Sequence, residues 1–304
     1  MLGKYKGIWP VAPTPFYSDG QLDLEGMKRI LDFMIDAGVD GICLLANYSE
    51  QFVLSDEERE TLTKVSLEHV NGRVPVIVTI SHFATQIAVA RAKRAKELGA
   101  AMVMLMPPYH GATIRAQPEQ IFEHFSYVGD VGIPIMIQDA PMAGNDLSVP
   151  LLVRMAREIE MVKLFKVECI PATSKLRELI AAGGDAIEGP FDGEEGITLM
   201  ADLDAGATGT MTSASIPDKI KPILEQHAQG NREAAADIYR QVLPMINFEN
   251  RQCLWRSAKA AMVEGGIIRS DYCRHPQTAL HPSIRDGLLD VLRPLDPLVL
   301  RWGH

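Results

Sequence analysis

Lys166 and Glu168 stand at the end of a short, mostly apolar stretch, residues 161–168. Successive side chains of a strand point to opposite faces, so in a strand these two residues would share one face with Leu164. Burial disfavours the charged form of a lysine amine and lowers its pKa. A neutral amine can attack a carbonyl carbon and form a Schiff base. Lys166 is therefore a candidate nucleophile, and the structural alternative is a strand-end lysine whose amine reaches solvent.

The composition is that of a globular enzyme. The chain has 304 residues, of which 47% are hydrophobic and 23% charged, and its formal net charge is −9. This charge argues against nucleic acid and anionic membranes as partners. No apolar run reaches the roughly 18 residues of a membrane helix, and residues 1–16 lack the apolar block of a secretion signal. We therefore expect a cytoplasmic protein that acts on a small molecule.

The cysteines and histidines do not form the patterns of metal sites or disulfide frameworks. The four cysteines are scattered, with no CxxC pair. No two histidines have HxH or HExxH spacing, and no Gly-rich nucleotide-binding loop follows an apolar run. A Schiff-base lysine supplies the electron sink that a metal would provide, so we expect no cofactor and no metal.

Short apolar runs alternate with segments of helical periodicity along the first two thirds of the chain. The apolar runs, which predict strands, are residues 7–12, 40–45, 74–79, 101–106, 133–138, 162–166, 185–189 and 207–211. The predicted helices between them are residues 24–37, 56–69, 86–98, 118–128, 148–159, 174–182 and 196–204. Continuously apolar runs are typical of parallel strands buried on both faces. Eight such units predict an α/β fold of the (β/α)8 TIM barrel class.

Helix-capping patterns agree with this organisation. Ser55 and Asp192 each precede a glutamate by three residues, as in a capping box. After residue 216 the strand pattern stops. The predicted helices beyond this point are residues 219–229, 232–247, 251–264 and 282–292. We therefore predict a catalytic barrel at residues 1–216 and a helical C-terminal extension, packed on the barrel, at residues 217–304.

In a TIM barrel the active site lies at the carboxyl ends of the strands. Lys166 is the only lysine at one of the eight predicted strand ends, which favours the functional interpretation of its position. Polar residues at or beside the other ends include Asn47, Tyr48, Ser49, His82, Tyr109, His110, Gln138 and Glu188.

The layout resembles the dihydrodipicolinate synthase and N-acetylneuraminate lyase family of class I aldolases over nearly the whole chain. Residues 164–168, Leu-Phe-Lys-Val-Glu, are similar to the family's strand with the Schiff-base lysine. Residues 46–50, Ala-Asn-Tyr-Ser-Glu, stand where the family has the loop that holds the substrate carboxylate. Residues 107–110, Pro-Pro-Tyr-His, stand where it has a Pro-Tyr-Tyr turn. The resemblance implies a Schiff base between Lys166 and a 2-keto acid, and it favours a homotetramer.

Three departures from the family pattern argue against a lysine-pathway synthase. Gln138 stands where most members have a tyrosine that relays protons to the substrate hydroxyl. His110 replaces the second tyrosine of the turn, and residues 142–143 lie where the synthase has an arginine. One branch of the family is similar at these positions too, and it dehydrates L-2-keto-3-deoxyarabonate in non-phosphorylative pentose breakdown. The stretches similar to this branch are residues 44–52, 106–113, 138–141, 185–190 and 296–302.

The resemblance implies a five-carbon substrate with hydroxyls on C4 and C5. Attack of Lys166 on the C2 ketone would form an iminium, which acidifies the C3 protons. Loss of a C3 proton and of the C4 hydroxyl as water, followed by tautomerisation, would give 2-ketoglutaric semialdehyde. Cleavage of the C3–C4 bond, as in an aldolase, requires a base on the C4 hydroxyl. Gln138 cannot be that base because an amide has no useful pKa. We therefore expect a hydro-lyase.

The remaining residues have expected roles in this reaction. Glu168 is the first acid/base candidate, with an ion pair that only holds Lys166 as the alternative. Tyr109 and His110 are the next candidates, since a histidine can protonate a leaving hydroxyl near neutral pH; His110 could also contact a neighbouring subunit. The expected binding residues are Asn47, Tyr48 and Ser49 for the carboxylate, Gln138 at its strand end, His82 at the pocket floor and Glu188 for a sugar hydroxyl.

Three other functions stay open on the sequence alone. Two of them belong to the same family. One is a deaminase that converts 4-hydroxy-pyrroline-2-carboxylate to the same semialdehyde, and the other is a pyruvate-forming aldolase of 2-keto-3-deoxy sugar acids. Both need Lys166 and the carboxylate loop, so ammonia or pyruvate release has to separate them. A ligand sensor without catalysis is the alternative from another class. The presence of both Lys166 and Glu168 argues against it, whereas a lack of borohydride trapping with any keto acid would favour it.

Overall fold

The computed structural model describes residues 5–108, 116–140 and 147–304. Contacts between Cα atoms divide the chain into two compact units, residues 1–6 with 76–211 and residues 7–75 with 212–304. Strand and helix alternate along the chain from β1 to β8, and a helical part follows. This order confirms the predicted (β/α)8 class with a C-terminal helical extension. The boundary between residues 216 and 217 stays a prediction.

Parallel strands form the sheet of the first unit. They are β3 Val76–Thr79, β4 Met102–Leu105, β5 Ile135–Asp139, β6 Val162–Val167, β7 Phe191–Asp192 and β8 Gly209–Thr210. Each of these strands pairs in parallel with the next one along the chain. Every residue of β3, β4 and β5 is buried. Burial on both faces explains why their sequences are continuously apolar.

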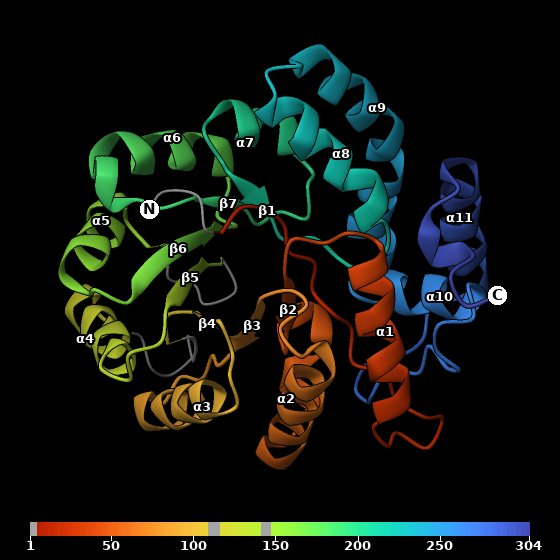
Figure 1. The fold of residues 1–304 in the computed structure, drawn as a ribbon, viewed down its shortest axis with the longest axis horizontal. Coiled ribbons are helices and arrows are strands. Elements are labelled where there is room, and N and C mark those ends of the chain that lie inside the picture. The colour runs from red at the N-terminus through yellow and green to blue at the C-terminus, as the bar shows by residue number, and fades with distance from the viewer. Residues whose placement is uncertain (1–4, 109–115, 141–146) are drawn as a thin grey trace. The chain divides into compact units, whose positions relative to one another are not determined.

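Helices connect these strands and cover their outer side. They are α3 Thr85–Glu97, α4 Pro118–Gly129, α5 Val149–Glu158, α6 Ala172–Gly183 and α7 Leu199–Asp204. Figure 1 shows α3 to α6 side by side around the strands β3 to β6. Local signals start two of the helices. Gln117 forms a capping box with Gln120 before α4, and the Ser148 side chain accepts from the N–H of Leu151 at the start of α5.

The seventh strand does not occupy the predicted residues 185–189, so that prediction was wrong. Residues Gly184–Ala186 form a 3₁₀ turn, and β7 begins at Phe191. The apolar residue that suggested a strand, Ile187, instead packs against α6. A Cβ atom on Gly183 would lie only 2.2 Å from its Cγ1. The apolar run is therefore used for helix packing before the strand begins.

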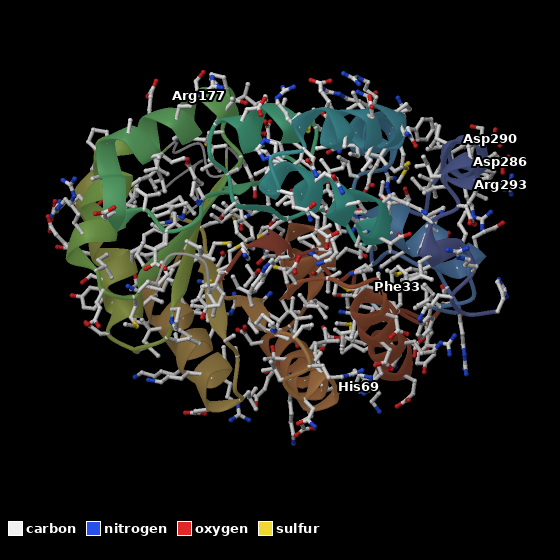
Figure 2. All side chains as sticks on the ribbon, turned by 45° about the horizontal axis from the view of Figure 1, so that its top comes forward. Phe33, His69, Arg177, Asp286, Asp290 and Arg293 are labelled. Atoms are coloured by element: carbon white, nitrogen blue, oxygen red, sulfur yellow. The ribbon has the colours of Figure 1, made fainter. Side chains whose placement is uncertain are left out.

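The second unit contains the first two strands and the first two helices. These elements are β1 Gly7–Ile8, α1 Leu24–Asp36, β2 Ile42–Leu44 and α2 Asp56–Val70. Val11 forms a parallel bridge with Cys43, which joins the segment after β1 to β2. The two helices pack against each other. At their contact Nε2 of His69, labelled in Figure 2, lies 2.9 Å from Oδ1 of Asp32.

The C-terminal extension is helical, as the sequence predicts. Its helices are α8 Pro217–Ala228, α9 Arg232–Phe248, α10 Arg256–Glu264 and α11 Pro282–Leu292. A π-helical turn, Glu249–Cys253, separates α9 from α10. The predicted helix at 251–264 therefore starts late, after Leu254, whose φ of 54° ends the turn. None of the described helices is long and apolar enough to cross a membrane.

Candidate active site

Strand β6 buries Lys166 beside Glu168. Lys166 is 3% exposed, and its Nζ lies 2.8 Å from Oε1 of Glu168. The N–H of Glu168 donates to the carbonyl oxygen of Asp139, which extends the pairing of β6 with β5 past the last strand residue. Because the two side chains are two positions apart on an extended backbone, they share one face. The structure thus brings together the pair that strand alternation predicts, and their catalytic roles stay a prediction.

Gln138 completes this group from the neighbouring strand. It is the Cα partner of Lys166 in the register of β5 with β6. Its Nε2 donates to Oε1 of Glu168 at 2.7 Å, so the same carboxylate oxygen faces the amine of Lys166 and the amide of Gln138. Gln138 is 1% exposed. One carboxylate oxygen thus joins residues of two neighbouring strands.

The amide oxygen of Gln138 is buried and, among the described residues, has no hydrogen-bond partner. The contact with Glu168 uses the NH₂ end of the amide, because only that end of Gln138 can donate a hydrogen bond. A buried acceptor without a partner is unfavourable by about 1–3 kcal/mol. Such an atom is suited to accept from a ligand hydroxyl or a water molecule.

Gly193 lies against both members of the lysine–glutamate pair, which the sequence alone did not indicate. A Cβ atom at this position would lie 2.6 Å from Cγ of Glu168 and 2.9 Å from Cγ of Lys166. The N–H of Gly193 donates to the carbonyl oxygen of Val167 at 3.1 Å. The backbone after β7 therefore packs directly on the two side chains, and only glycine leaves them room.

Asp192 fixes the turn that contains Gly193. Its side chain accepts from the N–H groups of Glu194 and Gly196, each at 3.0 Å, and from Oγ1 of Thr210 at 2.5 Å. Complete burial raises the pKa of Asp192 to about 7. The interpretation of Asp192 as a helix cap was wrong, because α7 begins only at Leu199 and Asp192 is the last residue of β7. Its hydrogen bonds instead hold the turn beside the lysine.

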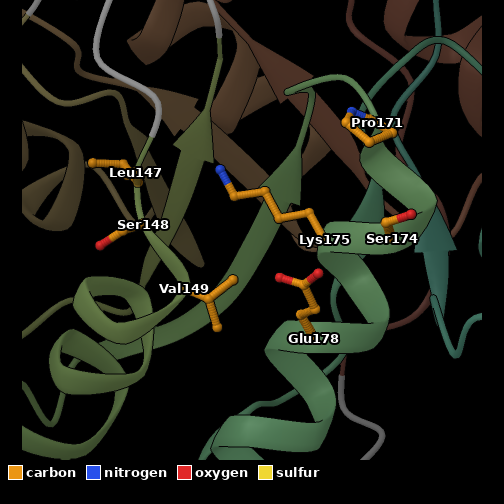
Figure 3. A pocket seen from close by; sticks show the side chains of 7 residues that line it. All are labelled: Leu147, Ser148, Val149, Pro171, Ser174, Lys175 and Glu178. Carbon is orange, nitrogen blue, oxygen red and sulfur yellow. The ribbon is translucent and has the colours of Figure 1, made fainter.

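An ion pair beside Gln138 joins the end of β5 to the first turn of α6. Asp139, fully buried, lies 2.6 Å through Oδ2 from Nζ of Lys175 and accepts from the N–H of Leu147 at 3.2 Å. Lys175 lines an open pocket of about 390 Å³. Figure 3 shows its side chain extending from α6 toward the segment of Leu147 and Ser148. This pair anchors the carboxyl end of β5 next to Gln138.

The predicted carboxylate loop, residues 46–50, follows β2 in the second unit. The 3₁₀ turn Asn47–Ser49 forms its centre. The side chain of Ser49 is hydrogen-bonded within this unit. Its Oγ donates to the carbonyl oxygen of Ala12 at 2.7 Å and accepts from the N–H of Ala46 at 3.2 Å. These contacts hold the loop, while the role of Ser49 toward a carboxylate stays a prediction.

Asn47 and Tyr48, the other two predicted binding residues of the loop, also have side-chain contacts within this unit. The Oδ1 atom of Asn47 accepts from Nε2 of Gln51 at 2.6 Å. The hydroxyl of Tyr48 donates to Oδ1 of Asn250, in the π-helical turn, at 3.4 Å. These contacts orient both side chains, while their role toward a carboxylate stays a prediction.

The remaining predicted residues have different outcomes. Glu188 precedes β7 at the amino end of the strands, 4.0 Å through Oε1 from Nζ of Lys163, so it lies away from Lys166 and its assignment to the site is corrected. His82 lies partly buried after β3, and its Nδ1 accepts from the N–H of Ala84 at 2.9 Å.

Tyr109 and His110 lie outside the described residues. In the part of the chain that the structure describes, no three His, Cys, Asp or Glu side chains are placed to hold a metal ion.

Eight β/α units and a buried lysine at the end of the sixth strand define a barrel enzyme of the α/β class. The chain belongs to the dihydrodipicolinate synthetase family, whose model matches residues 4–294. The chain is 59% identical over 302 residues to an L-2-keto-3-deoxyarabonate dehydratase of Azospirillum brasilense, with 99% of this chain and 98% of the relative covered. It is 26% identical to a 4-hydroxy-tetrahydrodipicolinate synthase of Methanosphaerula palustris, over 80% of this chain and 83% of that one.

Solved structures agree with the family assignment. A Pseudomonas aeruginosa protein assigned to the dihydrodipicolinate synthetases superposes with a TM-score of 0.90 at 29% identity, covering 96% of this chain and 99% of that one. A dihydrodipicolinate synthase of Rhodopseudomonas palustris superposes with a TM-score of 0.87 at 24% identity, covering 96% and 98%. The second likeness concerns the fold alone. Both confirm the predicted (β/α)8 barrel.

Proposed function

We propose that this chain removes water from L-2-keto-3-deoxyarabonate through a Schiff base on Lys166 and yields 2-ketoglutaric semialdehyde. The observation that carries the proposal is the buried group of Lys166, Glu168 and Gln138, in which one carboxylate oxygen lies within 2.8 Å of both the amine and the amide nitrogen. The high identity to a dehydratase of this name supports the choice of substrate.

Glu168 prepares Lys166 for attack. The amine must lose a proton before it can add to a ketone, and the carboxylate oxygen 2.8 Å away is placed to take it. Attack of Nζ on C2 forms a carbinolamine. Glu168 returns its proton to the former ketone oxygen, which leaves as water; this gives the iminium and restores the Glu168 carboxylate. The iminium draws electrons from the C2–C3 region and acidifies the C3 protons.

Glu168 then acts a second time, on carbon. Its carboxylate lies next to the iminium nitrogen. Because this nitrogen is bonded to C2, the carboxylate is near C3 and can remove a proton from it. The resulting enamine pushes electrons toward C4 and expels the C4 hydroxyl, which leaves as water after protonation. Transfer of a proton from C5 back to C3 gives an enol at C4 and C5. The enol tautomerises to the aldehyde, and hydrolysis of the iminium frees Lys166.

Gln138 directs the reaction toward elimination. Its amide oxygen is suited to accept a hydrogen bond from a substrate hydroxyl, and the amide cannot take the proton away. Cleavage between C3 and C4 needs that proton removed. The substrate hydroxyl is thus oriented without being activated for aldol cleavage, and loss of water is the remaining path.

The other assignments rest on the family resemblance and on the positions of the residues at strand ends. Residues 47–49 would bind the substrate carboxylate, His82 would line the site, and Tyr109 or His110 would protonate the leaving hydroxyl. We also propose a cytoplasmic homotetramer that serves non-phosphorylative pentose breakdown. Light scattering of the purified protein tests the assembly directly.

A product assay tests the proposal. Purified protein and the variant Lys166→Ala are incubated with L-2-keto-3-deoxyarabonate, and semialdehyde and pyruvate are followed through separate coupled dehydrogenases. Semialdehyde from the wild type alone is the expected result. Pyruvate would show that a residue other than Gln138 supplies a base for cleavage. Ammonia from 4-hydroxy-pyrroline-2-carboxylate, with neither product from the sugar acid, would identify the deaminase.

A further inference from the structure

Glu50 closes the loop that follows β2, in an unusual backbone conformation. Its φ of 58° lies in the left-handed region, which residues other than glycine seldom adopt. It ends the turn Asn47–Ser49 and begins the turn Gln51–Val53. A conformation of this kind persists only where surrounding contacts enforce it. The contacts that hold Glu50 therefore also set the direction of the residues before it.

The C-terminal extension supplies those contacts. The Glu50 side chain, 2% exposed, forms an ion pair through Oε1 with Nζ of Lys259 in α10, whose side chain is 1% exposed. Nζ of Lys259 also donates to the carbonyl oxygen of Tyr272 at 2.8 Å. The N–H of Arg274 donates to Oε2 of Glu50 at 3.2 Å. Both carboxylate oxygens are thus bonded to the extension.

Arg274 holds the other end of the same short segment. Its Nη1 donates to the carbonyl oxygen of Val53 at 2.9 Å. The cationic groups of Arg274 and Lys259 each lie 4.5 Å from the ring centroid of Phe16, which is 1% exposed. A cation over a buried ring is stabilised by the ring electrons. The segment from Glu50 to Val53 is therefore fixed at both ends by the extension.

Stability alone does not account for a buried ion pair at this position. Removing two charges from water offsets most of their attraction, and an apolar pair of similar volume is often equally stable. What such a pair provides is direction, because a charge-assisted hydrogen bond is strong only in a narrow geometry. Glu50 immediately follows the loop of Asn47 and Tyr48, so the pair is placed to set the orientation of that loop.

We propose that Lys259 is a positioning residue for binding of the substrate carboxylate and that it acts through Glu50. The inference rests on the proposed function, because it takes residues 47–49 as the carboxylate-binding loop. It assigns part of substrate binding to the C-terminal extension, at a residue 209 positions from Glu50 in the sequence.

The test compares a charged and an uncharged keto compound on the full chain. Pyruvate carries the carboxylate and methyl pyruvate does not, and borohydride traps either one on the lysine. The variants are Lys259→Met and the double variant Glu50→Gln/Lys259→Met, which leaves no unpaired buried charge. Half-saturation by pyruvate and the KM for L-2-keto-3-deoxyarabonate should rise about tenfold, since a charge-assisted hydrogen bond is lost or misdirected. Half-saturation by methyl pyruvate and kcat should change less than about threefold.

The control variant is Glu264→Gln/Arg285→Met. It removes a 2.9 Å ion pair of the extension that does not involve the loop, and it should leave both half-saturation values unchanged. Melting temperatures are recorded for every variant, and Glu50→Gln alone carries the test if neither methionine variant folds. Unchanged pyruvate binding, or equal weakening for both compounds, would overturn the inference. A wild type that traps neither compound would overturn the proposed function itself.

Discussion

Nε2 of Gln138 and Nζ of Lys166 share one oxygen atom of Glu168, at 2.7 and 2.8 Å. A tyrosine in place of Gln138 would bring a titratable hydroxyl into the site, whereas the amide brings a donor for Glu168 and an acceptor without proton-transfer capacity. In the proposed mechanism, the identity of residue 138 decides between loss of water and cleavage of the C3–C4 bond.

Replacing Gln138 by tyrosine should change the reaction. We expect Gln138→Tyr to lower the rate of dehydration by about 100-fold. Glu168 loses its amide donor, and the substrate hydroxyl then faces a group that can take its proton. Pyruvate should appear as a new product, measured with a coupled lactate dehydrogenase. The control Gln138→Met removes the amide without adding a hydroxyl and should lose dehydration without releasing pyruvate. Absence of pyruvate from the tyrosine variant would count against the role given to residue 138.

Replacing Glu168 by glutamine should separate Schiff-base formation from proton transfer. Glu168→Gln keeps the shape of the side chain and removes its basicity, so kcat should fall by about 10²–10⁴-fold. Borohydride should still trap a keto acid on Lys166 after long incubation, because the amine can lose its proton to water. The two readouts are the coupled product assay and the mass of the intact protein. A kcat within tenfold of the wild type would mean that Glu168 only holds the lysine.

Gly193 should not tolerate a side chain. The Cβ atom of Gly193→Ala would lie 2.6 Å from Cγ of Glu168, so either the pair or the turn must move. A displacement of this size is expected to lower kcat about 100-fold. Gly129→Ala is the matched control, because its Cβ would meet a side-chain methyl of Ile159 in the helical layer instead. Equal kcat losses in the two variants would point to general destabilisation.

Stability should fall as the pH rises toward and above neutrality. Burial raises the pKa of Glu249 to about 7, from 4.5. The folded protein therefore binds this proton more tightly than the unfolded chain, so the stabilisation is complete below pH 4.5 and is lost as the pH rises through 7. For Glu249 alone the loss amounts to about 3 kcal/mol.

Urea unfolding at several pH values measures this dependence. The Glu249 carboxylate accepts from Oγ of Ser257 at 2.7 Å, and Glu249→Gln keeps an acceptor there without a titrating group. The variant should show a flatter profile between pH 4.5 and 8. Glu233→Gln, at a side chain that is 79% exposed, should leave the profile as in the wild type. Parallel profiles for Glu249→Gln and the wild type would show that Glu249 does not cause the pH dependence.

Local sequence signals predicted features of both units. Side-chain alternation placed Lys166 and Glu168 on one face of a strand, and the capping box of Ser55 with Glu58 marks the start of α2 as predicted. Both patterns depend on residues within a few positions of one another. Local backbone geometry sets such patterns, so they can be recognised from the sequence alone.

The features that the sequence did not reveal depend on contacts between distant segments. Glu188 is a separate case, because its neighbour Ile187 packs on the end of α6, only four residues earlier in the chain, rather than continuing a strand. The contact of Gly193 with the lysine strand and the ion pair of Glu50 with Lys259 join residues that are far apart along the chain. No periodicity or short motif marks such pairs, because they arise only from the packing of separate elements.

The mass of the intermediate trapped on the protein tests the Schiff-base mechanism directly. Wild-type protein is mixed with L-2-keto-3-deoxyarabonate, reduced with borohydride, digested and analysed by mass spectrometry. Dehydration through a Schiff base predicts a five-carbon adduct on Lys166, including the form that has lost water. A three-carbon adduct on Lys166 would show cleavage to pyruvate, and an unmodified Lys166 would contradict the Schiff-base mechanism altogether.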